Sequence, residues 1–199
     1  MKIVGVGAGP GLLTQEAASV IENAEIIFGS KRAIELAKEH IRCDATEISD
    51  YTLKGIPENA VVLSTGDPML SGLGKYAKKG DEIIPGISSM QLACARLRLD
   101  IGELSVITAH SRDIARVKER LIKELGDGKN VFLLPDSSFG IDEIAGLLIS
   151  KGFSREITAC ERLGYADEKI ISGTTEKPPC TGSEMYCVVI SNSSLKMTT

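Results

Sequence analysis

The sequence predicts an α/β protein, and three observations support this class. Apolar segments typical of strands alternate with amphipathic segments typical of helices along the first half of the chain. Turns that contain glycine or proline follow several of the strand-like segments. The length of 199 residues suffices for one large domain or for two small domains, each with its own core.

The first hundred residues are expected to form one complete α/β unit with a mainly parallel sheet. Strands are predicted at residues 2–6, 25–28, 60–64 and 82–84, and helices at residues 14–24, 31–40, 70–78 and 88–97. In the first helix the apolar residues recur at helical spacing, so one face should pack on the sheet. Thr14 is a suitable N-cap for that helix.

A short charged segment with a glycine, residues 98–103, interrupts this pattern and is the predicted linker. It separates an N-terminal domain, residues 1–100, from a C-terminal domain, residues 104–191. Strands are predicted there at 104–108, 131–134, 157–160, 168–171 and 185–190, and helices at 114–125 and 141–150. This domain is richer in strands, and we expect a mixed sheet. Residues 192–199 are polar and should form a loose tail.

Composition and charge argue against several classes of protein. The net charge of −4 and the pI of about 5.3 disfavour nucleic-acid binding, which depends on Lys and Arg. No apolar run approaches the roughly 18 residues of a membrane span. The five cysteines include no C-x-x-C pair and have no His nearby, which argues against zinc and for buried thiols in a reducing cytoplasm. We therefore expect a cytoplasmic protein that binds a small molecule and no metal.

A glycine-rich loop, Gly5 to Gly11, follows the first predicted strand but does not fit a dinucleotide-binding fingerprint. A G-x-G-x-x-G motif that starts at Gly5 requires glycine where Pro10 stands, and one that starts at Gly7 requires glycine where Leu12 stands. The acidic residue that would hold a ribose is also missing after the second strand. The loop can either approach a bulky flat ligand closely or simply turn tightly.

Two further turns stand between a predicted strand and a predicted helix. In the first, Thr65 to Pro68, glycine permits close approach of a ligand, while Asp67 could equally cap a helix. In the second, Ser88 and Ser89 could cap the next helix or hold polar groups of a cofactor, and both roles can hold at once. Because the carboxyl ends of parallel strands share one edge of a sheet, we expect these turns and the glycine-rich loop to meet at one crevice.

His110, Ser111 and Arg112 follow the first strand of the second domain. The simplest interpretation is a Ser111 helix cap flanked by surface residues. Arg112 could instead pair with carboxylates of an acidic ligand, since its guanidinium forms paired hydrogen bonds with them.

Taken in order, these motifs resemble the tetrapyrrole methylase family. The resemblance is carried by the glycine-rich loop from Val4 to Gly11, by Gly66-Asp67-Pro68, and by Pro85-Gly86-Ile87-Ser88-Ser89. His110-Ser111-Arg112, Pro135-Asp136 and the segment 160–174 are similar to the branch that methylates C5 of cobalt-precorrin-7 in cobalamin synthesis. Members of this branch more often have His-Gly-Arg where this chain has His110-Ser111-Arg112, and Thr-Asp where it has Pro135-Asp136.

The resemblance implies that S-adenosylmethionine (SAM) binds in a cleft between two α/β domains and leaves as S-adenosylhomocysteine (SAH). The residues implied to bind this cofactor are Pro10, Thr65, Gly66, Asp67, Leu70, Ser88 and Ser89 in the first domain and Leu134, Leu163 and Gly164 in the second. The residues implied to face the tetrapyrrole substrate are Gly7, Gly9, Gly11, His110 and Arg112. A nucleophilic carbon of the macrocycle would displace the sulfonium methyl directly, so alignment is the main requirement. No catalytic residue is assigned, and His110 is a candidate general base.

The resemblance also implies a homodimer and a separate protein for methylation at C15 and decarboxylation. Alternatives remain open from the sequence. The substrate or the methyl position could differ within the same fold. A nucleotide-binding oxidoreductase and a non-catalytic binding subunit are alternatives of other classes.

Overall fold

The computed structural model describes residues 1–191, and the predicted tail at 192–199 lies outside this range. The chain divides into two compact units, Met1–Ser89 and Met90–Thr199. The predicted linker lies further along the chain, where Asp100 caps a short 3-10 helix, Ile101–Glu103. Within residues 1–191, no helix is both long enough and apolar enough to cross a bilayer.

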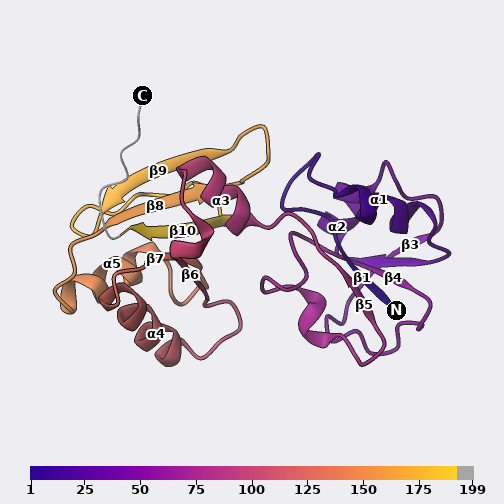
Figure 1. Ribbon diagram of the computed structural model, residues 1–199, viewed down its shortest axis with the longest axis horizontal. Helices are drawn as coiled ribbons and strands as arrows, with labels where there is room; N and C mark the ends of the chain where they lie inside the picture. Colours follow the sequence, from indigo (N-terminus) through magenta and orange to yellow (C-terminus); the bar gives the residue numbers. More distant parts are fainter. Residues whose placement is uncertain (192–199) are drawn as a thin grey trace. The chain divides into compact units, whose positions relative to one another are not determined.

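The first unit contains a five-stranded sheet in the order β3-β2-β4-β1-β5. Its strands are β1 (Lys2–Gly5), β2 (Ile27–Gly29), β3 (Ala45–Glu47), β4 (Val61–Ser64) and β5 (Glu82–Ile84). Every pairing is parallel, as predicted. The carboxyl ends of β4, β1 and β5 therefore lie side by side at one edge of this sheet (Figure 1).

Two helices cover one face of the first sheet and bury the core of this unit. They are α1 (Gln15–Glu22) and α2 (Lys31–Ala37). The Thr14 hydroxyl accepts a hydrogen bond from the Ala17 N–H at 3.1 Å, which confirms the predicted N-cap. Ser30 caps α2 in the same way. On the opposite face, a smaller apolar cluster forms around the fully buried Ile3 and Val62.

One predicted element of the first unit is wrong, and one strand was missed. The segment predicted as a helix at 70–78 forms only a 3-10 helix, η1 (Leu73–Tyr76). Ser71 before it has a left-handed φ of 58°, and a Cβ on Gly72 would lie 2.8 Å from the Pro68 carbonyl oxygen, so the chain turns too tightly for an α-helix. Strand β3 was not predicted, because all three of its residues are exposed and it lacks an apolar pattern.

The second unit contains a mixed five-stranded sheet in the order β6-β7-β10-β8-β9, which confirms the predicted class. Its strands are β6 (Leu104–Thr108), β7 (Asn130–Leu134), β8 (Glu156–Glu161), β9 (Lys169–Thr174) and β10 (Tyr186–Ser191). β6 runs parallel to β7, and β10 runs antiparallel to both β7 and β8. The strands β6, β7 and β8 therefore all point in one direction, and their carboxyl ends share one edge.

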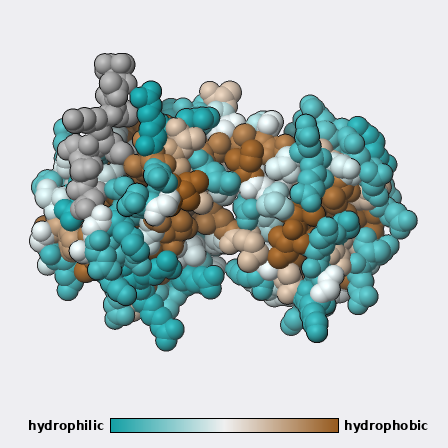
Figure 2. Space-filling model, viewed as in Figure 1, coloured by the Kyte–Doolittle hydropathy of each residue, from teal (hydrophilic) through white to brown (hydrophobic). Residues whose placement is uncertain are grey.

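Helices lie on both faces of the second sheet. On one face, α4 (Ile114–Gly126) and α5 (Ile141–Ser150) bury the large core, while hydrophilic residues cover the solvent side of α4 (Figures 1 and 2). On the other face lies α3 (Ser89–Leu97), whose Arg96 forms an ion pair with Glu168 at 2.7 Å. Cys94 of α3 and the buried Cys160 and Cys187 of the sheet lie on this face, and all five cysteines of the chain are free thiols.

Candidate functional site

Main-chain hydrogen bonds join the three turns at the carboxyl edge of the first sheet. Gly66 after β4 and Gly7 after β1 exchange two of them, with N–O distances of 2.8 and 3.3 Å. The Ala8 N–H donates to the Ile87 carbonyl after β5 at 2.9 Å. The predicted meeting of these three turns is confirmed, and they form one continuous rim.

Some glycines of this rim are required for packing, and others leave space for a ligand. A Cβ on Gly5 would lie 2.6 Å from the Gly86 nitrogen, and a Cβ on Gly86 would collide with the Gly66 carbonyl oxygen. Gly66 and Gly11 both have left-handed φ angles, 68° and 73°, but a Cβ on Gly11 would have no heavy atom within 4 Å, and one on Gly66 would lie 3.9 Å from the Ser88 Cα, an ordinary contact. Close approach of a ligand to the main chain is therefore possible at Gly66 and Gly11, whereas Gly5 and Gly86 serve the contact between turns.

Asp67 fixes the geometry of two turns at once. Its Oδ1 accepts the Met69 N–H at 2.7 Å, and its Oδ2 accepts the Gly86 N–H at 3.1 Å. No α-helix begins here, so Asp67 is not the helix cap that the sequence left open. Both carboxylate oxygens are used to hold the rim, which makes Asp67 a positioning residue of this edge.

Two side chains at the first rim were missed by sequence reasoning. Arg32, in the first turn of α2, donates from Nη2 to the Ala8 carbonyl at 2.7 Å and so holds the glycine-rich loop. Met69 is 64% exposed beside Asp67 and is one of the most exposed large apolar side chains. A basic residue just after the carboxyl end of β2 was the available signal for Arg32, while nothing in the sequence singles out Met69.

The predicted binding residues of the first unit lie on or next to this rim. Pro10 and Gly11 are exposed, Thr65, Gly66, Asp67, Leu70 and Ser89 are half-buried, and Ser88 is buried. Gly7 and Gly9 are buried within the loop. The buried glycines shape the loop, so the exposed part of it is Pro10 and Gly11.

The second sheet has a comparable edge where β6 and β7 end. His110 follows β6 and Asp136 follows β7, and His110 Nδ1 lies 3.8 Å from Asp136 Oδ2. Ser111 has a left-handed φ of 56°, and the cap of α4 is Asp113, which accepts the Ala115 N–H at 3.0 Å. The predicted Ser111 helix cap is therefore wrong, because Asp113 caps α4, and the Ser111 N–H donates to Asp136 after β7.

The turn after β8 is held by ion pairs. Gly164 has a φ of 83° and donates its N–H to Glu168 Oε2 at 2.7 Å, while Glu168 also pairs with Arg96 of α3. Arg162 forms an ion pair with Asp167 at 2.6 Å. Leu163 is buried and Gly164 is half-buried, as is Leu134 at the end of β7. The predicted residues of the second unit, His110, Arg112, Leu134, Leu163 and Gly164, thus all lie at or next to its carboxyl edge.

Comparisons with known proteins agree on one family. The family model for tetrapyrrole (corrin/porphyrin) methylases matches residues 2–179. The probable cobalt-precorrin-7 C(5)-methyltransferase of Methanocaldococcus jannaschii is 37% identical over 185 residues, which cover 83% of this chain and 85% of that protein. The cobalt-precorrin-7 C(5)-methyltransferase of Salmonella typhimurium is 28% identical and covers 85% of this chain and 88% of that one.

A longer relative and a solved structure complete the comparison. The chain is 28% identical to the decarboxylating precorrin-6Y C(5,15)-methyltransferase of a Sinorhizobium species but spans only 44% of it. The crystal structure of precorrin-6Y methylase from Archaeoglobus fulgidus has a TM-score of 0.75 and 29% identity, over 97% of this chain and 98% of that chain. These similarities do not favour a nucleotide-binding oxidoreductase. The chain belongs to the tetrapyrrole (corrin/porphyrin) methylases and is a C-methyltransferase that uses S-adenosylmethionine as its methyl donor.

Proposed function

We propose that this enzyme methylates C5 of cobalt-precorrin-7 in cobalamin synthesis. The observation that carries the substrate assignment is the 37% identity to the M. jannaschii protein, which extends over most of both chains. The jointly held turns of the first unit supply a rim suited to a small ligand, which the proposed activity needs.

The rim of the first unit fits SAM in its backbone geometry. The space beside Gly11 is open and the neighbour of Gly66 is a backbone atom, the Ser88 Cα at 3.9 Å, so a ligand can approach both glycines without meeting a side chain. Half-buried Thr65 and Ser89 offer hydroxyls beside them. In this proposal the cofactor residues of the first unit are Pro10, Thr65, Gly66, Asp67, Leu70, Ser88 and Ser89. Asp67 acts by holding two turns in place.

The edge of the second unit is proposed to contribute Leu134, Leu163 and Gly164 to the cofactor and His110 and Arg112 to the substrate. A tetrapyrrole precursor carries several carboxylates, and the exposed Arg112 can form paired hydrogen bonds with one of them. In the glycine-rich loop, Gly7 and Gly9 shape the backbone and Gly11 lies open to the substrate. SAM supplies an electrophilic methyl group, and the chain supplies alignment of the two reactants.

The test is methylation of cobalt-precorrin-7 by the purified chain with SAM. The expected product carries one additional methyl group at C5, located by NMR with carbon-13 in the transferred methyl, and has not lost carbon dioxide. Calorimetry should show binding of SAH and no binding of NAD. Methylation at another carbon, or turnover only with a different precorrin, would contradict the substrate assignment. Binding of SAH without turnover would indicate a binding subunit.

The oligomeric state and the cellular location of the enzyme are also proposals. We propose a homodimer, which light scattering on the purified chain can test. The free thiols support a reducing cytoplasm as its location. We also propose that a separate protein carries out methylation at C15 and decarboxylation, because the M. jannaschii and S. typhimurium relatives, of which 85% and 88% are matched, are named for C5 methylation alone.

A further inference from the structure

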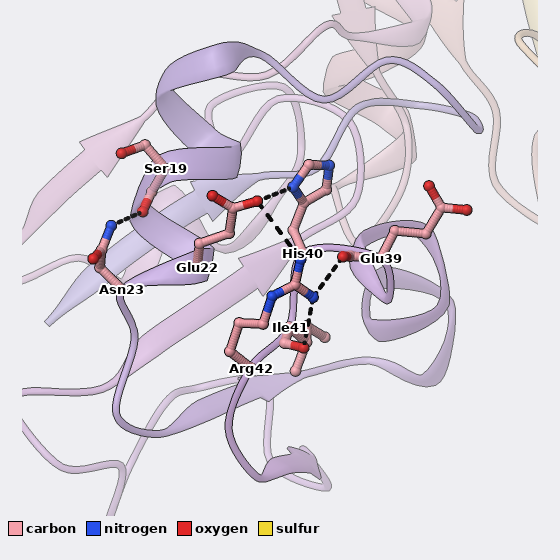
Figure 3. Close-up of polar contacts among 7 residues, drawn as sticks. All are labelled: Ser19, Glu22, Asn23, Glu39, His40, Ile41 and Arg42. Carbon is pink, nitrogen blue, oxygen red and sulfur yellow. Dashed lines mark hydrogen bonds and ion pairs between the residues drawn. The ribbon is translucent and has the colours of Figure 1, made fainter.

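The chain contains two histidines, and each lies beside a carboxylate in a different setting. His40 Nδ1 lies 2.7 Å from Glu22 Oε1, and Arg42 approaches the same carboxylate at 3.9 Å (Figure 3). This pair joins the ends of α1 and α2, which return from the carboxyl edge of the first sheet. His110 and Asp136 instead lie at the carboxyl edge of the second sheet, where two strands end together.

Adjacent strand ends bring His110 and Asp136 together. β6 and β7 are parallel neighbours in which Thr108 pairs with Leu134. The register continues for one more residue, since the Ala109 N–H donates to the Leu134 carbonyl at 2.8 Å. The turn that carries His110 and the turn that carries Asp136 therefore begin at the same level of the sheet. The buried sheet therefore places the two turns that carry His110 and Asp136 beside each other.

Asp136 is fixed by several donors. Its Oδ1 accepts the Ser138 N–H at 3.1 Å and the Ser138 hydroxyl at 2.9 Å. Hydrogen bonds from the Ser138 main chain and hydroxyl are the main cause that lowers the pKa of the Asp136 carboxyl, and the Ser111 N–H and the charge of His110 add to this. The carboxylate is thus anionic at neutral pH and has its second oxygen, Oδ2, on the side of His110.

The strain in the turn after β6 fits a role for this arrangement. Ser111 adopts a left-handed φ of 56°, a backbone conformation that residues other than glycine rarely adopt. The Ser111 N–H is among the donors to Asp136, so the strained residue ties the His110 turn to that carboxylate. The His110 side chain remains 66% exposed, and its ring is open to a ligand.

We propose that Asp136 orients His110, through Nδ1, so that the free Nε2 accepts the proton released when methyl replaces hydrogen on the substrate carbon. The inference rests on the proposed function. An electron pair of the macrocycle forms the new C–CH3 bond while the C–S bond breaks and its pair stays on sulfur. The C–H bond of the same carbon then breaks, its pair returns to the macrocycle, and the proton moves to Nε2. Asp136 is a positioning residue that also stabilises the imidazolium.

The ring is 3.8 Å from the carboxylate, which is an ion-pair contact longer than a hydrogen bond. Contacts of this kind commonly shorten when substrate is bound. A small rotation of the exposed ring is sufficient here, because the Asp136 carboxylate is already fixed by Ser138. Loss of a general base slows a reaction by about 10²- to 10⁴-fold.

The experiment compares two matched pairs of variants in single turnover with SAM and cobalt-precorrin-7. His110→Gln and Asp136→Asn remove the proposed pair, and His40→Gln and Glu22→Gln remove the other histidine–carboxylate pair as controls. Formation of the methylated product that has lost its C5 proton should slow by about 100-fold or more in His110→Gln and should be unchanged in the controls. With deuterium at C5 of the substrate, His110→Gln should show a primary isotope effect that the wild type lacks. Added imidazole should partly restore a His110→Ala variant.

Nitrogen-15 NMR of the histidine rings gives a readout that does not depend on turnover. In the neutral ring of His110, we expect the proton on Nδ1, and Asp136→Asn should shift that proton toward Nε2. Unchanged tautomers in Asp136→Asn, or equal rates in His110→Gln and the wild type, would overturn the proposal. If the wild type methylates a different carbon, the substrate assignment fails on its own, and the tautomer measurement still decides whether Asp136 orients His110.

Discussion

Gly86→Ala tests whether the three turns of the first unit must touch for the rim to exist. The new Cβ would collide with the Gly66 carbonyl oxygen and would lie 2.8 Å from the Gly5 carbonyl carbon. All of these neighbours are backbone atoms, so the strain cannot be relieved by moving the end of a side chain. At least one turn must shift, and the hydrogen bond from Gly86 to Asp67 must lengthen or break.

The expected loss of stability in Gly86→Ala follows from overpacking, which costs about 1–3 kcal/mol in a well-packed site. For a chain of this length the melting temperature changes by roughly 2–4 °C per kcal/mol, so Gly86→Ala should lower it by roughly 2–12 °C. Because the turns also form the proposed cofactor rim, the affinity for SAH should fall as well. Differential scanning calorimetry and titration calorimetry with SAH measure the two effects.

Gly146→Ala is the matched control. Gly146 lies inside α5, is exposed, and has open space where a Cβ would stand. Alanine is favoured over glycine within a helix by about 0.5–1 kcal/mol, so this variant should raise the melting temperature by roughly 1–4 °C. SAH affinity should not change. If Gly86→Ala melts within about 1 °C of the wild type and binds SAH equally well, the rim does not depend on contact between the turns.

Three further outcomes follow from the structure. Asp67→Ala removes the acceptor for the Met69 and Gly86 N–H groups and should cost about 1–3 kcal/mol in urea unfolding, with weaker SAH binding; an unchanged urea midpoint would show that these bonds contribute nothing. The N-terminal ammonium lowers the pKa of Asp81, with which it pairs at 2.8 Å. The stabilisation of the folded state by this ion pair is therefore complete above the pKa that Asp81 has in the unfolded chain, and it is lost as pH falls below about 4. Asp81→Asn should flatten the acid limb of the stability curve measured by urea unfolding, and an N-terminal extension is the control. A thiol reagent should modify the exposed Cys180 first, since a hydrogen bond with Cys160, and then burial, raise the pKa of the Cys187 thiol; rapid reaction of Cys187 in the folded enzyme would contradict this.

Local pattern was sufficient for most of the fold. Strand β6 was predicted at its observed bounds, and α1 begins at the predicted cap, because each has a clear apolar period and a distinct terminus. The helix predicted at 70–78 failed because the contacts that forbid it involve Gly72 and the Pro68 carbonyl within a folded turn. No propensity scale contains that information. Exposed edge strands such as β3 carry too little apolar pattern to be recognised.

The candidate site could likewise be predicted only in part. Strand-end turns could be found from glycine and proline, and topology then requires those of one parallel sheet to share an edge. The partners of individual side chains could not be found. Asp67 meets Gly86, Arg32 meets Ala8, and His110 meets Asp136 only after the strands are aligned. Each of these contacts joins residues at least 19 positions apart, as the Asp67–Gly86 separation shows.

The glycine packing at the first rim limits where new specificity can arise. Gly5 and Gly86 have no room for a side chain, so a substitution there strains the contact between the turns, whatever ligand is bound. Pro10, Gly11 and Met69 are exposed, and changes at these positions leave the contact between the turns intact. The outer positions of the proposed binding rim can therefore vary while its inner positions stay fixed.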